Sequence, residues 1–211
     1  RAPVIHFVTR EGRKYLIDEG ILEPEEIPDI PQIGPKNGSH VAHELQIRDA
    51  RVWLHLVHRA NPAHGGLERW QTGGSSIFPL NRSSAPYEVR PDAWFVYQLG
   101  RGVFVGFVEI DRGTEKSPRR WEEKFVSYAL LMGSGLVQEY TGYQKGRVLI
   151  TAPNYNRLVS IGAVLAPLIS QYPHLQDRFW VTEHKNLSWA SLYEPVWYIP
   201  GSPHFQPLVS R

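Results

Sequence analysis

The apolar positions of this chain follow two different periods, and these predict its elements. Residues 43–60 carry apolar side chains at helical spacing, with His43 at the start of the main stripe. Val52 and Leu56 belong to a second apolar side of this segment, which predicts a helix covered on two sides. The other predicted elements are strands at 67–73, 90–98, 102–111, 147–153, 178–184 and 195–199 and helices at 117–132 and 156–169. This order predicts an α/β fold, in which helices flank a central mixed sheet.

Prolines mark a boundary ahead of the first long helix. Four of them fall within residues 23–39, where they oppose a regular helix because proline lacks the amide hydrogen and clashes with the preceding turn. We therefore expect a surface linker over 23–39, one domain over 40–199 and a C-terminal tail over 200–211. Residues 1–22 are too short to fold alone, and the initial Arg rather than Met suggests a fragment or a processed chain.

The runs at 90–98 and 102–111 meet at a Gly-Arg corner, which predicts a β-hairpin. A two-residue loop at this corner places Asp92 opposite Glu109. Facing carboxylates repel each other, and a hard divalent cation between them would reverse the sign of that interaction. The alternatives are a solvated end of the sheet, where the repulsion is small, or a register shifted by one residue.

The same register places Arg90 opposite Asp111, on the covered side of the strand that also carries Glu109. A cross-strand ion pair with Arg90 would account for Asp111 without any function. Asp111 therefore has two interpretations, as a member of an acidic site or as a structural ion pair.

The helix predicted at 117–132 carries a second unusual feature. Lys124 lies on its apolar stripe, one turn before Tyr128. A lysine on a covered face either extends its amine to solvent or directs it at a site, and the neighbouring acids favour the site. Lys116, Arg119 and Arg120 cluster at the start of this helix and suit phosphate binding, with a solvated loop as the alternative.

Composition narrows the class of protein. Of the 211 residues, 42% are hydrophobic and 21% are charged, as in ordinary globular domains. The chain shows neither a membrane-spanning run nor a secretory signal pattern, so we expect a soluble, cytoplasmic protein without a membrane partner. It has no cysteine, so any metal must be bound by oxygen or imidazole. The net charge of +2 permits nucleic acid as a partner and does not require it.

Four segments carry a resemblance to known proteins. The order of elements, with Pro91-Asp92 on one strand and Glu109 on the next, resembles the core of the PD-(D/E)xK, restriction-endonuclease-like nucleases. More narrowly, the chain resembles the replication-relaxation family of bacterial plasmids and mobile elements over about residues 6–152. The segments concerned are HELQIRDARVWL at 43–54, RPDAWF at 90–95, VEIDRGTE at 108–115 and KFVSY at 124–128. In that family a winged helix-turn-helix precedes this domain, and FVTREGRKYL at 7–16 resembles its end.

This resemblance implies a restriction-endonuclease-like core of order αβββαβαβ and metal-dependent cleavage or nicking of DNA in plasmid replication or relaxation. It gives Asp92 and Glu109 the places of the metal-binding acids, with Asp111 as a further candidate ligand and Mg²⁺ or Mn²⁺ as the ion. Asp111 stands where the motif has lysine, so Lys124 is expected to supply that charge.

The remaining expected roles follow from the same resemblance. His43 and Tyr128 are expected beside the metal and Lys124, and the expected DNA contacts are Arg112, Lys116, Arg119 and Arg120. One alternative is an inactive nuclease-like fold that binds DNA. Another is a scaffold that contacts replication or mobilisation proteins.

Overall fold

The computed structural model describes residues 18, 38–80, 87–100, 102–114 and 117–209. The chain divides into two compact units, Arg1–His40 and Val41–Arg211. The winged-helix remnant expected at 1–22 and the linker expected at 23–39 lie outside the described residues, apart from residue 18 and the start of the first long helix.

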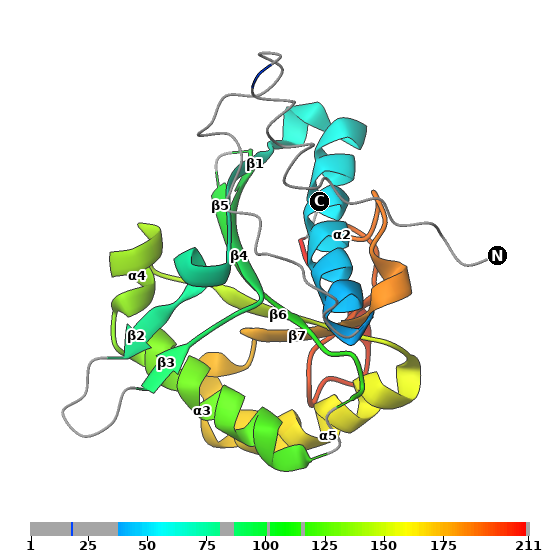
Figure 1. The fold of residues 1–211 in the computed structure, drawn as a ribbon. Coiled ribbons are helices and arrows are strands. Elements are labelled where there is room, and N and C mark those ends of the chain that lie inside the picture. The colour runs from blue at the N-terminus through cyan, green and yellow to red at the C-terminus, as the bar shows by residue number, and fades with distance from the viewer. Residues whose placement is uncertain (1–17, 19–37, 81–86, 101, 115–116, 210–211) are drawn as a thin grey trace. The chain divides into compact units, whose positions relative to one another are not determined.

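Seven strands form one mixed sheet in the order β1-β4-β5-β6-β7-β8-β9 (Figure 1). The strands are β1 (Leu67–Thr72), β4 (Ala93–Leu99), β5 (Gly102–Ile110), β6 (Arg147–Ala152), β7 (Phe179–Glu183), β8 (Trp197–Tyr198) and β9 (Phe205–Gln206). β5, β6 and β7 are parallel, and the remaining neighbours pair antiparallel. A central mixed sheet, as predicted, is therefore present. The pairing of β1 with β4 contains a bulge or irregularity between Leu67 and Arg69.

The β4–β5 hairpin has the predicted register. Ala93 pairs with Val108 and Leu99 pairs with Gly102, so the two strands are adjacent and antiparallel throughout. Gly100 at the turn has φ of 54°, in the left-handed region that glycine adopts without steric cost.

The long helices lie on both faces of the sheet (Figure 1). They are α2 (Gly38–Ala60), α3 (Pro118–Gly133) and α5 (Tyr155–Gln171), with a short α4 (Leu136–Thr141) after α3. α3 and α4 connect β5 to β6, and α5 connects β6 to β7, because parallel strands need crossover connections. α3 and α5 pack on one face and α2 packs on the other. No helix in the described ranges has the length and apolarity needed to cross a bilayer.

Two apolar clusters fill the space between these layers. Phe107 of β5 packs in the cluster that contains Phe125 and Tyr128 of α3, and the next residue, Val108, packs in the cluster that contains Leu54 of α2. Successive residues of a strand point to opposite faces. Glu109 therefore shares the α3 side with Phe107, as the sequence predicted.

Several short elements were not predicted. β2 (Phe78–Leu80) and β3 (Tyr87–Val89) form a separate two-stranded sheet, and β9 lies in the segment 200–211 that was expected to be a tail. Within the described residues, four 3₁₀ helices occupy Pro62–His64, Gly73–Ser76, Pro173–Leu175 and His184–Asn186. The sheet extends beyond the predicted order αβββαβαβ by β8, which lies within the strand predicted at 195–199, and by β9, whose two residues show no readable period.

The prediction that α2 is covered on two sides is wrong. Its main stripe is buried, including Leu54 and Val57, whereas Val52 and Leu56 on the second side are 52% and 43% exposed. α2 is therefore a surface helix with one core-facing side.

Candidate functional site

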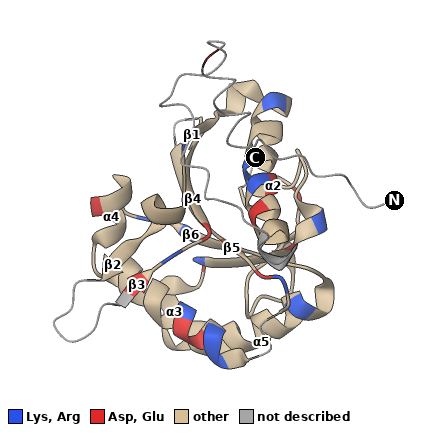
Figure 2. Ribbon diagram, viewed as in Figure 1, with Lys and Arg blue, Asp and Glu red and all other residues tan. Residues whose placement is uncertain are grey.

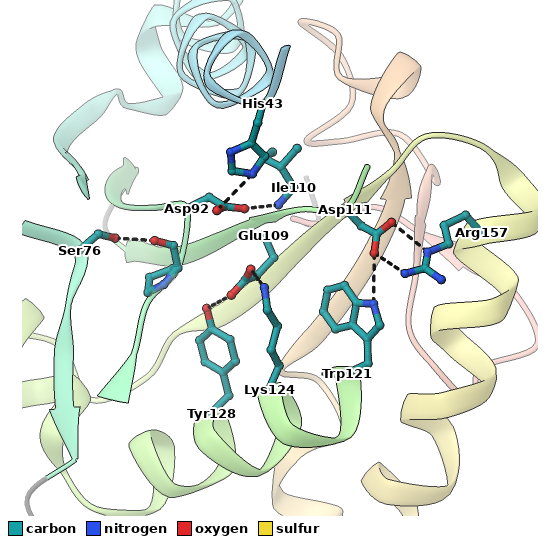
Figure 3. A network of polar contacts seen from close by, with 11 residues as sticks. His43, Ser76, Asp92, Glu109, Ile110, Asp111, Trp121, Lys124, Tyr128 and Arg157 are labelled. Atoms are coloured by element: carbon teal, nitrogen blue, oxygen red, sulfur yellow. Dashed lines mark hydrogen bonds and ion pairs between the residues drawn. The ribbon is translucent and has the colours of Figure 1, made fainter. Parts of the chain in front are cut away.

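Glu109 lies near the end of β5 and is the centre of a polar network under α3 (Figure 3). Its side chain is only 2% exposed. The Tyr128 hydroxyl donates a hydrogen bond to Oε1 over 2.8 Å, and the Lys124 ammonium pairs with Oε2. Burial raises the pKa of the Glu109 carboxyl, while the charge of Lys124 opposes that shift.

Asp92 lies directly before β4, outside the ladder, which ends at the pair Ala93–Val108. Its backbone N–H donates to the Val108 carbonyl over 3.0 Å, and its Oδ2 accepts a 2.7 Å hydrogen bond from the Ile110 amide. The negative charge of Asp92 contributes to the raised pKa of Glu109, as expected for neighbouring acids. The carboxylates of Asp92 and Glu109 border one pocket, and we call them the acid pair.

Two aromatic groups hold the acid pair from opposite sides of the sheet. His43 of α2 places Nε2 3.3 Å from Oδ1 of Asp92, and this contact raises the pKa of His43. Tyr128 of α3 is buried, and burial followed by the charge of Glu109 raises its pKa well above the ordinary value. Tyr128 is therefore a hydrogen-bond donor to Glu109 at neutral pH rather than a source of phenolate.

Lys124 contacts Glu109 of the acid pair and an aromatic ring. Its Nζ lies 5.2 Å from the centroid of the Trp121 ring, one turn earlier on the same helix. An ammonium over an indole face is attracted by the ring quadrupole. Lys124 was expected either to extend its amine to solvent or to direct it at the site. The structure has the second arrangement, because the amine points at Glu109.

The pocket in front of the acid pair is open and has a volume of about 570 Å³. β3 and the residues after it form one wall, and α3 forms the other. Along the first turns of α3, two arginines are followed by two glutamates and a lysine, which Figure 2 marks in blue and red on the ribbon. The rim carries Glu88, Arg90, Arg119, Arg120 and Glu123.

His43 borders a smaller neighbouring pocket of about 210 Å³. Arg112 and Asp111 line that pocket, and Lys124 lines both pockets. Lys124, Tyr128 and the acid pair thus line the same larger pocket. His43 contacts Asp92 from the neighbouring smaller pocket.

Asp111 turns away from the acid pair toward α5 (Figure 3). Arg157 donates to both of its carboxylate oxygens, from Nε to Oδ1 over 2.9 Å and from Nη2 to Oδ2 over 2.7 Å. The Trp121 indole N–H also donates to Oδ2, over 3.2 Å, and the Gly113 amide donates to Oδ1 over 2.6 Å. The structure therefore does not bring Asp111 together with the other two candidate ligands.

The expected ion pair between Arg90 and Asp111 is wrong. Arg90 precedes β4 and pairs with Glu88 of β3 instead. The ladder ends at the pair Ala93–Val108, so the predicted register does not extend to Arg90. Asp111 forms its ion pair with Arg157 instead.

The acid pair has the donor chemistry of a magnesium or manganese site. Each of its four oxygens has one of the partners named above, and an ionised carboxylate oxygen can accept more than one hydrogen bond or ligand. Mg²⁺ is commonly held by one or two carboxylates together with waters and substrate phosphates. Within the part of the chain that the structure describes, no group of three or more His, Asp or Glu is arranged to hold a metal. The acid pair could thus supply two carboxylate ligands to such an ion, and the described residues do not form a closed cage around it.

Three of the four expected DNA contacts, Arg112, Arg119 and Arg120, line the two pockets. Arg119 is exposed and pairs with Glu123 over 2.8 Å, and Arg120 lines both pockets. Lys116 lies outside the described residues.

Sequence reasoning missed three supporting residues. Ser76 donates to the Pro91 carbonyl over 3.0 Å and so holds the residue before Asp92. Arg157 and the N–H of Trp121 bind Asp111. Trp121 was visible as part of the apolar stripe, whereas no local signal connects Arg157 to a residue 46 positions earlier.

Comparison with known proteins gives one match. The sequence model of a family described as replication-relaxation matches residues 1–146, more than half of the chain. The matched region includes the acid pair, Lys124 and Tyr128 and ends before β6. No curated protein and no solved structure gives a significant match.

Proposed function

The chain belongs to the replication-relaxation family, and from that premise we propose that it cleaves or nicks DNA with a divalent metal ion during replication or relaxation of plasmids or mobile elements. The coarser role in replication or relaxation follows from the family. The observation that carries the proposed chemistry is the buried Glu109 carboxylate, which borders an open pocket together with Asp92 and has the Lys124 amine on it.

Each residue of the pocket has a role in this proposal. Asp92 and Glu109 hold Mg²⁺ or Mn²⁺, an ion that activates water and stabilises the departing oxygen when it is bound. Lys124 neutralises Glu109 and offers a positive charge where a phosphate would approach. Tyr128 and His43 orient the two carboxylates through the contacts described above.

Burial supports a functional rather than a merely structural acid. Desolvation of a carboxylate is costly, and an apolar residue on this face of β5 would fill the space without that cost. Glu109 is buried, has a raised pKa, pairs with one specific cation and lines a pocket. Functional groups are commonly found in this kind of environment.

A plasmid-nicking assay tests the proposal. Supercoiled DNA is incubated with the parent protein with and without Mg²⁺ or Mn²⁺, and with the Asp92→Asn and Glu109→Gln variants. We expect cleavage only with metal, and a loss of at least about 100-fold in each variant, because each loses one metal-binding carboxylate. Glu122→Gln is the matched control, since Glu122 is an exposed acid of α3 that does not line the pocket.

DNA binding should survive both substitutions, because they remove negative charge from the pocket. Metal-independent cleavage by the parent, or parental rates in both variants, would contradict the assignment of the acid pair.

The contacts of Lys124 and Asp111 favour a second function. Lys124 already pairs with Glu109, and Asp111 stands at the motif's lysine position and is bound by Arg157. This charge balance suits a domain that keeps the nuclease-like site and only binds DNA. That function predicts no cleavage with any metal, together with DNA affinity that falls steeply with salt. Affinity for a replication protein without such DNA binding would indicate a scaffold instead.

A further inference from the structure

A second polar cavity lies at the opposite end of the sheet from the acid pair. It has a volume of about 540 Å³ and is formed where β5, β6 and β7 begin. Its lining includes Phe104, Lys145, Arg147, Arg178, Trp180 and Leu208. Glu109 lies near the other end of β5, so this cavity is separate from the candidate nuclease site.

Arg147 is held rigidly in the wall of this cavity. Its guanidinium carbon lies 4.7 Å from the centroid of the Trp180 ring and 5.6 Å from that of Phe104. Nη1 donates a 2.6 Å hydrogen bond to the Leu208 carbonyl. A guanidinium held by rings and a carbonyl is preorganised. It has five N–H groups, and the bond to Leu208 uses one of them.

Among the described residues, no acid lies within ion-pair distance of the Arg147 guanidinium. Asp177, the acid of this cavity, pairs with Arg178 over 3.2 Å and acts on Arg147 through its charge at longer range. Burial lowers the pKa of Arg147, but a guanidinium stays protonated at neutral pH. Lys145 is exposed and forms no ion pair within the described ranges. With Lys145, Arg147 and Arg178 against Asp177, the described lining of the cavity has an excess of two positive charges.

We propose that this cavity binds a phosphate monoester, carried by a free nucleotide or by the end of a DNA strand. A guanidinium fork matches two phosphate oxygens, and a phosphate monoester carries close to two negative charges above its second pKa of about 6. Arg147 and Lys145 together supply the two matching positive charges. A single carboxylate would neutralise only one of them.

Titration of the full chain with inorganic phosphate tests this site, with ¹H–¹⁵N NMR as the measurement at constant ionic strength and pH 7.5. The Trp180 indole N–H donates to the Asp177 carbonyl over 2.8 Å, so its signal reports on the cavity wall. We expect saturable shifts of the Trp180 indole and Arg147 Nε–H signals, and tighter binding of phosphate than of acetate. No saturation, or equal affinity for acetate, would overturn the assignment.

Variants identify the residues that bind the phosphate. Arg147→Gln should weaken binding at least about 10-fold, since a charge-assisted bidentate contact is lost. Lys145→Ala should weaken it several-fold, and because Lys145 is exposed this variant keeps the test valid if Arg147→Gln does not fold. Lys185→Ala is the matched control, as an exposed lysine outside the cavity. Unchanged affinity in Lys145→Ala and in any folded Arg147→Gln would refute the site.

Two further titrations distinguish the sources of the phosphate. If a nucleoside 5′-monophosphate saturates the cavity at a lower concentration than inorganic phosphate does, the ligand is identified as a nucleotide. A 5′-phosphorylated oligonucleotide that binds more tightly than both the nucleotide and its unphosphorylated form identifies a strand end. Neither measurement requires cleavage, so the outcome is independent of the proposed nuclease activity.

Discussion

At the scale of single residues, Glu109 shows how a charged group is kept inside this protein. Its carboxylate is nearly inaccessible to water, and Lys124 and Tyr128 each bind one of its oxygens. Buried ion pairs of this kind contribute little net stability while both partners are present, but removing one partner leaves an uncompensated charge.

Lys124→Met is therefore expected to reduce the free energy of unfolding by about 3 kcal/mol at pH 8. Burial already raises the pKa of Glu109, and loss of Lys124 raises it further. The folded variant then binds a proton at Glu109 more tightly than the unfolded chain, so its stability is recovered as pH falls through the raised pKa. Urea unfolding at pH 5 and pH 8 measures this difference.

The double variant Lys124→Met with Glu109→Gln should regain much of the loss at pH 8, because no buried charge remains. Lys185→Met should change stability by less than about 0.5 kcal/mol, since Lys185 is exposed. A pH-independent loss in Lys124→Met would show that packing rather than charge determines its effect.

His43 predicts a pH dependence from the other side of the acid pair. Its hydrogen bond to Asp92 raises the pKa of His43 above 6.5, so the folded state favours the protonated ring. The resulting stability is fully present below about pH 6 and is lost as pH rises through the raised pKa. His43→Gln should thus lower stability by up to about 1 kcal/mol at pH 5.5 and by less at pH 8.5. Thermal unfolding at both pH values tests this, with exposed His204→Gln as the control.

At the scale of elements, Asp111 connects three of them behind the site. It follows β5 and accepts hydrogen bonds from Trp121 of α3 and Arg157 of α5. Trp121 in turn lies against the Lys124 ammonium. Asp111 therefore orients the face of α3 that carries Lys124, although it does not touch the acid pair.

Arg157→Met should destabilise the protein by about 3 kcal/mol, because Asp111 is only 6% exposed and loses its cation. The Gly113 amide, which donates to Asp111, should exchange its hydrogen faster in this variant. Hydrogen exchange and urea unfolding check the two effects. Adding Asp111→Asn should restore part of the stability, and no recovery would mean that the methionine itself disturbs α5.

The elements that could be predicted from sequence are those whose period is long enough to read. The hairpin register followed from one turn and the alternation of its strands, and it is confirmed from Ala93–Val108 to Leu99–Gly102. It does not extend to Asp92, whose amide donates to the Val108 carbonyl. The helical period put Lys124 and Tyr128 on the covered side of α3. β2 and β3 have three residues each and show no period, and the partner of Asp111 comes from a helix beyond another strand. Such long-range side-chain contacts depend on packing that the local sequence does not specify.

At the scale of the whole second unit, basic residues are distributed around the acid-pair pocket. Arg90 and Arg119 lie on opposite walls of it. If DNA crosses this pocket, each of them contacts a phosphate and releases a counterion. Arg90→Ala and Arg119→Ala should each reduce the slope of log affinity against log salt by about 1.

Fluorescence anisotropy with labelled duplex DNA at several salt concentrations measures these slopes. Arg59→Ala is the control, since Arg59 is an exposed arginine at the end of α2. Parental slopes in both pocket variants would place the DNA elsewhere on the protein.

The bulge in β1 has a consequence for aggregation. β1 is an outer strand of the seven-stranded sheet, and a flat outer strand offers its free amide and carbonyl groups to another chain. The irregularity between Leu67 and Arg69 interrupts the spacing of these groups, and charged Glu68 and Arg69 lie at the same place. At the opposite edge β9 has only two residues, too few to template a partner strand. Both edges of the sheet thus disfavour growth into intermolecular β-structure.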